Sequence, residues 1–126
     1  SGISNDMREI IIQYRKGDSR AKLALQIFTF VLKKYIAAYS AILERADALV
    51  FTAGIGENVP LVREMACEGL DFMGIGIDKK RNKKTIGKES IISNSSSKTK
   101  IFCILTNEEI VIARDTLKIV SKLKRK

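Results

Sequence analysis

The sequence predicts an α/β domain with a few-stranded, mainly parallel sheet and packed helices. Residues 48–52 and 100–105 are short apolar runs typical of buried strands, and helical patterns precede and follow them. Strands that alternate with helices favour a parallel sheet covered by helices. The chain has 126 residues, of which 45% are hydrophobic, so we expect residues 1–126 to form a single domain.

Two helices are predicted before the first strand. The first covers residues 5–16, and a long helix follows the break at Gly17 and runs to about residue 44. Lysines interrupt this long helix, whereas a membrane span needs about 20 nearly uncharged residues. We therefore expect a buried helix and no membrane span. Apolar residues spaced by three and four form its predicted face, at Leu23, Ile27, Phe30, Val31, Tyr35 and Ala38.

The second half of the chain predicts shorter elements. A helix over residues 60–68 begins with a proline, which suits a first turn, and stops at Gly69. The pattern is weakest over residues 75–100, where 90–93 favours a short strand and 94–97 a turn. A last amphipathic helix is expected over residues 108–122.

Cysteine usage and charge limit the class of protein. Cys67 and Cys103 occupy predicted core positions far apart, which favours buried, reduced thiols and a cytoplasmic location. The net charge of +9 suggests a nucleic-acid partner, but the lysine runs in 79–88 and 118–126 contain no aromatic residues that would stack on bases. We favour a solvated surface without a nucleic-acid partner; a non-catalytic basic module that binds nucleic acid is the alternative.

A glycine-rich turn follows the first predicted strand. Gly54 and Gly56 lack a Cβ, so the backbone is free to take positive φ and to lie flat against a ligand. A helix that starts after this turn would direct its free amides at a phosphate or a purine. Val59 replaces the third glycine of the dinucleotide fingerprint and no P-loop lysine follows, so neither common label applies. Structural glycines remain an equal alternative.

Three strings in this sequence resemble the acetate kinase family, in the family's order and at similar spacing. They are Phe-Thr-Ala-Gly-Ile-Gly-Glu-Asn at 51–58, Ser-Asn-Asp-Met-Arg-Glu at 4–9, and Thr-Asn-Glu-Glu at 106–109, followed by Ile-Ala-Arg-Asp-Thr at 112–116. The resemblance covers essentially the whole chain but only the C-terminal part of the family. We therefore expect a C-terminal, nucleotide-side fragment that lacks the N-terminal domain.

This resemblance implies a fold and a reaction. The fold would be a partial ribonuclease-H-like C-terminal domain of the actin-like ATPases. The parent enzyme would transfer the γ-phosphoryl group of ATP reversibly to acetate, with Mg²⁺, giving acetyl phosphate and ADP. It would act as a homodimer, to which part of the long helix's apolar face would contribute; packing within the chain is an equal alternative for that face.

The resemblance also implies site residues. A metal-associated glutamate would be Glu108. The nucleotide would be bound by Asp6, Met7, Arg8, Gly54, Ile55, Gly56, Glu57 and Asn58.

Local physics offers a structural role for several of these residues. Asp6 suits a helix start, and Arg8 is free to pair with a neighbouring acid. Asn58 is placed to cap the next helix. Thr106 and Glu109 have the spacing of a capping box, which leaves Glu108 at the carboxyl end of a strand, where it either holds Mg²⁺ or merely suits the helix dipole.

The chain contains no histidine, so the catalytic histidine of the resembled family is not in it. The family's substrate-side arginines and its phosphate-contacting loop would lie upstream of this sequence. We therefore assign no catalytic residue to this chain, and we expect the chain alone to be inactive. Because the acyl pocket would also lie upstream, a propionate or butyrate kinase is an open alternative.

Overall fold

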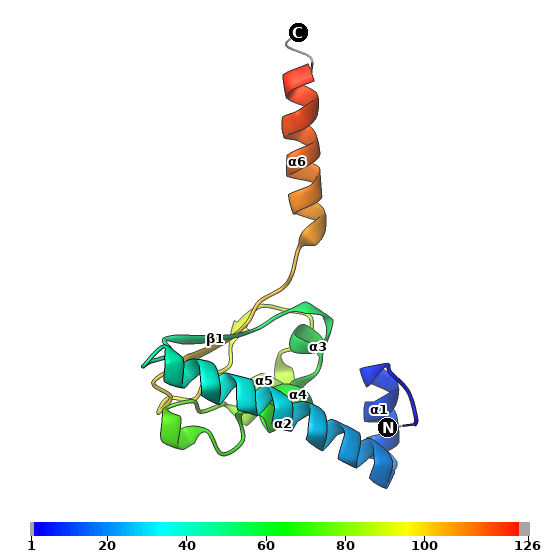
Figure 1. Ribbon diagram of the computed structural model, residues 1–126, viewed down its shortest axis with the longest axis vertical. Coiled ribbons are helices and arrows are strands. Elements are labelled where there is room, and N and C mark those ends of the chain that lie inside the picture. Colours follow the sequence, from blue (N-terminus) through cyan, green and yellow to red (C-terminus); the bar gives the residue numbers. More distant parts are fainter. Residues whose placement is uncertain (1, 124–126) are drawn as a thin grey trace.

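The computed structural model of the chain describes residues 2–123 (Figure 1). Residues 124–126, which end the second basic run, lie outside the described residues. The elements in chain order are α1 (Met7–Arg15), α2 (Ser19–Ile42), β1 (Ala48–Phe51), α3 (Ala53–Asn58), α4 (Pro60–Cys67), the 3-10 helix η1 (Asp71–Met73), α5 (Lys79–Lys84), β2 (Ser90–Ile91), β3 (Lys100–Cys103) and α6 (Glu108–Leu123).

The three strands form one small mixed sheet in the order β1-β3-β2. β1 and β3 are parallel, with Ala48 opposite Lys100 and Phe51 opposite Cys103. β2 adds an antiparallel partner on the other side of β3. The predicted α/β class and the predicted parallel pair are confirmed, and the short strand at residue 90 lies antiparallel to them.

The core lies between this sheet and the helices that cover it. Phe51 and Ile101 from the sheet pack with Ala66 and Cys67 of α4, and half-buried residues of α2 close the cluster. Both cysteines are free thiols with at most 2% of their surface exposed. This confirms the prediction of buried, unpaired thiols. The remaining buried members of the cluster are Leu70, Ile75 and Ile92.

The long helix α2 packs on α1 and α4 through a different face from the predicted one. Its buried residues are Ala21, Leu25 and Thr29. The Thr29 hydroxyl donates to the Leu25 carbonyl at 2.9 Å, so it is buried without loss of a hydrogen bond. The small side chains of Ala21 and Thr29 allow close helix approach. No described helix is long and apolar enough to cross a membrane.

Of the two alternatives for the apolar face of this helix, packing within the chain is therefore wrong. The exposed fraction of Phe30 is 66% and that of Val31 is 40%. Helix α2 carries apolar residues on two sides, so its periodicity does not decide which side meets the rest of the chain. The exposed side comprises Leu23, Ile27, Phe30, Val31, Tyr35 and Ala38.

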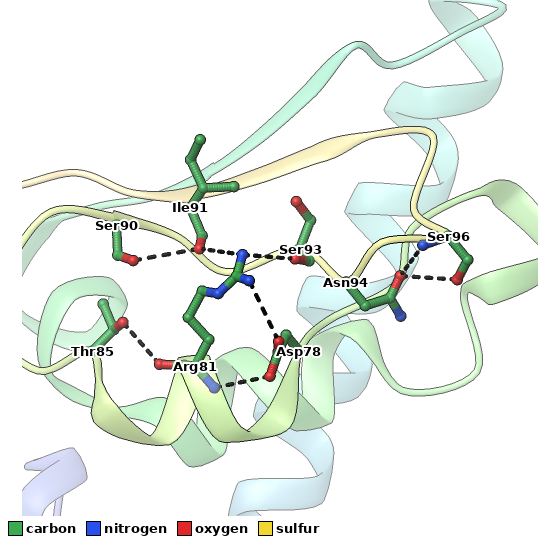
Figure 2. A network of polar contacts seen from close by, with 8 residues as sticks. All are labelled: Asp78, Arg81, Thr85, Ser90, Ile91, Ser93, Asn94 and Ser96. Atoms are coloured by element: carbon green, nitrogen blue, oxygen red, sulfur yellow. Dashed lines mark hydrogen bonds and ion pairs between the residues drawn. The ribbon is translucent and has the colours of Figure 1, made fainter.

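Helix α5 begins at a side-chain cap, because Asp78 accepts a hydrogen bond from the Arg81 backbone N–H at 2.9 Å. Figure 2 shows the Arg81 side chain reaching from this helix to the neighbouring strand segment, where it donates to the carbonyls of Ile91 and Ser93 at 3.3 and 3.4 Å. The Thr85 hydroxyl donates to the Arg81 carbonyl at 2.9 Å. These bonds fasten the lysine-rich helix to the edge of the sheet.

Both ends of α4 follow the sequence prediction, and another helix, α6, stands apart from the body. Pro60 occupies the first turn of α4, and Gly69 follows the helix with a φ of 75° in the left-handed region. α6 projects away from the α/β body after β3 (Figure 1), and residues 108–121 are all exposed.

Candidate functional site

A cavity of about 1360 Å³ opens between the start of α1, the segment after β1, and the loop after α5. It brings together two of the sequence strings that are almost 50 residues apart. Its predicted lining residues are Asp6, Met7, Arg8, Gly54, Ile55 and Asn58. Gly56, Glu57 and Glu108 were also predicted as site residues, but they do not line this cavity.

Ten further residues line the cavity and were not predicted as site residues. Tyr14 and Arg15 lie one to two helical turns beyond Met7 and Arg8, so helical spacing was a usable signal for them. Lys83 and Ile86 come from the region where the sequence pattern was weakest. The complete set is Asn5, Ile11, Tyr14, Arg15, Val59, Pro60, Leu61, Glu64, Lys83 and Ile86.

Asp6 caps helix α1 and pairs with Arg8. Its carboxylate accepts the Arg8 backbone N–H at 2.8 Å, and the Arg8 Nη2 lies 2.6 Å from Oδ2. The hydrogen bonds from the Arg8 side chain and backbone lower the pKa of Asp6, and the carboxylate raises the pKa of Arg8. The cap and the ion pair fix both charges at the cavity mouth. The structural role considered for these two residues is therefore present.

The glycine segment after β1 is a short helix, α3, and its glycines do not have positive φ. The positive value falls on Ala53, whose φ is 59°. The prediction that Gly54 and Gly56 take a left-handed φ is wrong, because the left-handed residue is Ala53, one position before Gly54. A Cβ on Gly56 would lie 3.1 Å from the Phe51 carbonyl carbon, whereas a Cβ on Gly54 would meet nothing within 4 Å. Gly56 permits close packing and Gly54 leaves the cavity open.

Asn58 does not cap helix α4, which corrects that prediction. Its amide donates to the Gly54 carbonyl at 3.0 Å, within α3. The residue at the N-cap position of α4 is Val59, which makes no side-chain capping bond. Asn58 is the last residue of α3, so its side chain is directed back along its own helix and towards the cavity.

Glu57 is a residue of α3 that lies behind the cavity. Its carboxylate connects the segment that follows β1 to the segment that follows β3. Its Oε1 accepts both the N–H and the hydroxyl of Thr106, each at 2.7 Å. The same hydroxyl accepts the Ala53 N–H at 2.9 Å and lies 2.9 Å from the Thr52 hydroxyl. Since the Thr106 proton goes to Glu57, Thr52 must be the donor in that pair. The bonds from Thr106 lower the pKa of Glu57.

The predicted capping box at the start of α6 is wrong. The Thr106 hydroxyl donates to Glu57 and accepts the Ala53 N–H, so it does not cap the helix. Asn107 is the cap instead, because its side chain accepts the Ile110 N–H at 3.1 Å. Glu109 therefore has no threonine cap with which to complete a capping box. Asn107 and Thr106 are both good capping residues, and the long-range bond to Glu57 decides between them.

Glu108 lies exposed in the first turn of α6, after the carboxyl end of β3. In the described part of the chain, no three Asp, Glu, Cys or His side chains gather as a metal cage. Mg²⁺ is usually held by one or two carboxylates together with waters and substrate phosphates, so a single exposed carboxylate matches the share that a protein supplies. Glu108 fits a metal that arrives with a nucleotide.

Comparison with known proteins identifies the same family throughout. The model of the acetokinase family matches residues 1–114. The acetate kinase of Thermotoga maritima is 50% identical over 125 residues, which is 98% of this chain and 31% of that protein. The chain thus spans about a third of the length of such relatives.

Two solved structures are similar in fold and sequence. The Porphyromonas gingivalis acetate kinase superimposes with a TM-score of 0.87 at 43% identity, over 95% of this chain and 30% of that one. A propionate kinase from Francisella tularensis superimposes with a TM-score of 0.79 at 42% identity, over 89% of this chain and 29% of that one.

Proposed function

The chain belongs to the acetokinase family, and we propose that it forms the nucleotide-binding part of an acetate kinase. Its α/β body corresponds to part of the actin-like ATPase fold of the acetate kinases that it resembles. The observation that carries the proposal is the single cavity shared by Asp6–Arg8 and by Gly54, Ile55 and Asn58. ATP or ADP would occupy this cavity.

The cavity walls offer a nucleoside two kinds of contact. Met7 and Ile55 are half-buried apolar side chains suited to the faces of a purine, and the open Gly54 lets the base approach the backbone. The Asp6 carboxylate and the Asn58 amide are suited to ribose hydroxyls. Gly56 and Glu57 would act behind this wall, by fixing the backbone of α3 rather than by touching the nucleotide.

Cations around the cavity favour the phosphates. Arg8, Arg15 and Lys83 line it, against the acids Asp6 and Glu64. Asp6 and Arg8 pair with each other, which leaves the cations Arg15 and Lys83 against the single carboxylate of Glu64. Bound Mg²⁺ would neutralise phosphate charge, and Glu108 is the residue of this chain that we propose to hold it.

We propose that the complete enzyme transfers the ATP γ-phosphoryl group reversibly to acetate. Phosphoryl transfer needs in-line positioning of the acceptor and positive charge around the moving group. This chain binds and orients the nucleotide, but it contains no histidine and no assigned catalytic residue. The chain alone is therefore proposed to be inactive.

Propionate is a second candidate for the acyl substrate. The similarity to a propionate kinase, at 42% identity, is nearly the same as the 43% to an acetate kinase. A butyrate-specific relative fits the described residues equally well. A substrate series on the complete enzyme distinguishes the three acids.

The exposed side of α2 and the two buried thiols support two further proposals. The apolar residues along α2 are suited to a second subunit, so we propose a homodimer. Free, buried thiols are typical of a reducing compartment, so we propose a cytoplasmic location.

The proposed function is tested by titrating the isotopically labelled chain with Mg-ADP at low and moderate salt while following backbone amide shifts. We expect shifts centred on residues 6–8 and 54–58 at both salt concentrations. Shifts confined to residues 79–88 and lost with salt would contradict the proposal and favour a basic module that binds phosphates without specificity. An unlabelled nucleic-acid duplex is the matched competitor.

A further inference from the structure

A fully buried arginine lies on α4 behind the cavity. The exposed fraction of Arg63 is 0%, and it is the largest fully buried side chain of the described residues. No carboxylate in the described part of the chain pairs with it, and burial lowers the pKa of its guanidinium. An arginine remains charged in such a place. Removing a charge from water without an opposite charge nearby costs free energy, so the hydrogen bonds of Arg63 must stabilise the fold enough to offset that cost.

All the strong hydrogen bonds of Arg63 go to amide oxygens. Nη1 donates to the Gly56 carbonyl at 2.6 Å, and Nε donates to the Asn82 side-chain oxygen at 2.7 Å. Nη2 donates to the Asn82 carbonyl at 3.1 Å and also to the Thr85 carbonyl. One planar group therefore holds backbone from α3 and from the C-terminal end of α5 at the same time.

Both segments contribute residues to the wall of the cavity, and they lie side by side, because the Gly87 N–H donates to the Glu57 carbonyl. Gly54, Ile55 and Asn58 line it from α3, whereas Lys83 and Ile86 line it from the end of α5 and the loop that follows. Arg63 itself does not line the cavity. Asn82, also fully buried, extends the connection because its amide donates to the Pro60 carbonyl at 2.9 Å. The guanidinium thus joins α3, α4 and α5 into one frame.

The wall formed by α3 has little freedom to shift on its own. The Gly56 backbone packs so closely on Phe51 that an added Cβ would lie 3.1 Å from its carbonyl carbon. From the segment after α5, the Gly87 N–H donates to the Glu57 carbonyl at 3.2 Å. The spacing of these two segments therefore depends on the bonds of Arg63, on the Asn82–Pro60 bond and on this backbone hydrogen bond.

We propose that Arg63 is a positioning residue for the nucleotide. It holds the α3 segment and the end of α5 at the separation that the ligand requires, without touching the ligand itself. This inference rests on the proposed function, because it assigns a role within the same cavity. It predicts that loss of the forked guanidinium weakens nucleotide binding more than it weakens the fold.

The test compares Arg63→Lys with Arg81→Lys in the labelled chain. Lysine keeps the charge but loses the fork. Arg81 is the matched control because it lies on α5, also donates to two backbone carbonyls (Figure 2), and does not line the cavity. We expect the Mg-ADP dissociation constant to rise at least tenfold in Arg63→Lys and to stay within twofold in Arg81→Lys. In the unliganded protein, amide signals of residues 56–58 and 85–87 should shift together only in Arg63→Lys.

Each outcome bears on one claim. Nucleotide binding by Arg63→Lys within twofold of the unchanged chain would overturn the positioning role and leave the proposed function intact. Equal weakening by both lysine variants would also overturn it, because general loss of stability would then explain the effect. No binding by the unchanged chain would overturn the proposed function and this inference with it. If Arg63→Lys does not fold, Asn82→Ala removes one acceptor, and it should weaken binding severalfold with the same paired shifts; unchanged binding would contradict the proposal.

Discussion

Glu57 and Thr106 lie 49 residues apart in the chain and are joined by two hydrogen bonds, because one carboxylate oxygen accepts both the N–H and the hydroxyl of Thr106 at 2.7 Å. The bond connects α3 to the segment between β3 and α6. Glu108 follows two residues after Thr106, in the first turn of α6.

Glu57→Gln should flatten the dependence of stability on pH. The bonds from Thr106 lower the pKa of Glu57, so the unfolded chain takes up this proton at a higher pH than the folded chain does. The stabilisation is complete above the ordinary glutamate pKa of about 4.3 and is lost as pH falls through the lowered value. Unfolding midpoints of the variant and the unchanged chain should differ at neutral pH and converge in acid.

Glu109→Gln is the control for this measurement, since Glu109 is exposed on α6. Its unfolding midpoints should follow those of the unchanged chain at every pH. Parallel curves for Glu57→Gln and the unchanged chain over the whole acid range would refute the role of the Glu57 charge.

Gly54→Ala and Gly56→Ala should have opposite effects on stability. Alanine at Gly54 meets no atom within 4 Å and improves helix propensity, so we expect a gain of about 0.5–1 kcal/mol in the free energy of unfolding. Alanine at Gly56 would lie 3.1 Å from the Phe51 carbonyl carbon, and we expect a loss of about 1–3 kcal/mol. Denaturant unfolding measures both.

The same pair separates binding from folding. Gly54→Ala adds a methyl group at the cavity, so its affinity for Mg-ADP should fall even though its stability rises. If the more stable variant binds Mg-ADP as tightly as the unchanged chain, the nucleotide does not approach Gly54.

Neither thiol should react while the chain is folded. Burial raises the pKa of Cys67 to about 12 and also raises that of Cys103. At pH 8 only about one Cys67 thiol in ten thousand is then ionised, and the thiolate is the reactive form. A coloured disulfide reagent should modify both cysteines only on unfolding. A burst of one equivalent in the native chain would show that one of the two is accessible.

Phe30→Glu should reduce self-association of the chain without unfolding it. Phe30 is 66% exposed in the middle of the apolar side of α2, where a charge would oppose burial against a second copy. Sedimentation should report a shift towards monomer with unchanged circular dichroism. Phe72→Glu is the matched control, because Phe72 is 84% exposed and belongs to η1, not to α2. Equal effects of the two substitutions would argue against an interface on α2.

Much of the fold could be predicted from local sequence. α2 and α4 have regular apolar spacing, Gly69 ends a helix, and the residues of β1 and β3 are apolar enough to be buried. Such signals lie within a few residues of each other. The convergence of Asp6–Arg8 with the α3 segment was predicted from the family resemblance, and the cavity joins most of those residues.

The errors arose where distant contacts decide between local options. Ala53 takes the left-handed φ that glycine would take more easily, two residues after the end of β1, and its N–H is bound by Thr106. Thr106 lost the capping role to Asn107 through Glu57. α5 has no apolar periodicity, and its position depends on Arg63 and Arg81. None of these partners is close in sequence.

The isolation of α6 has a consequence for cooperativity. Its 16 residues barely exceed the length of about 12–15 residues below which an isolated helix is marginal in water even with an Ala-rich sequence, and α6 is not Ala-rich. Because residues 108–121 gain almost no burial from the body, α6 should fray and reform as a unit of its own. Its amides should therefore exchange with solvent deuterium long before those of β1 and β3, whose protection reports the global free energy of unfolding.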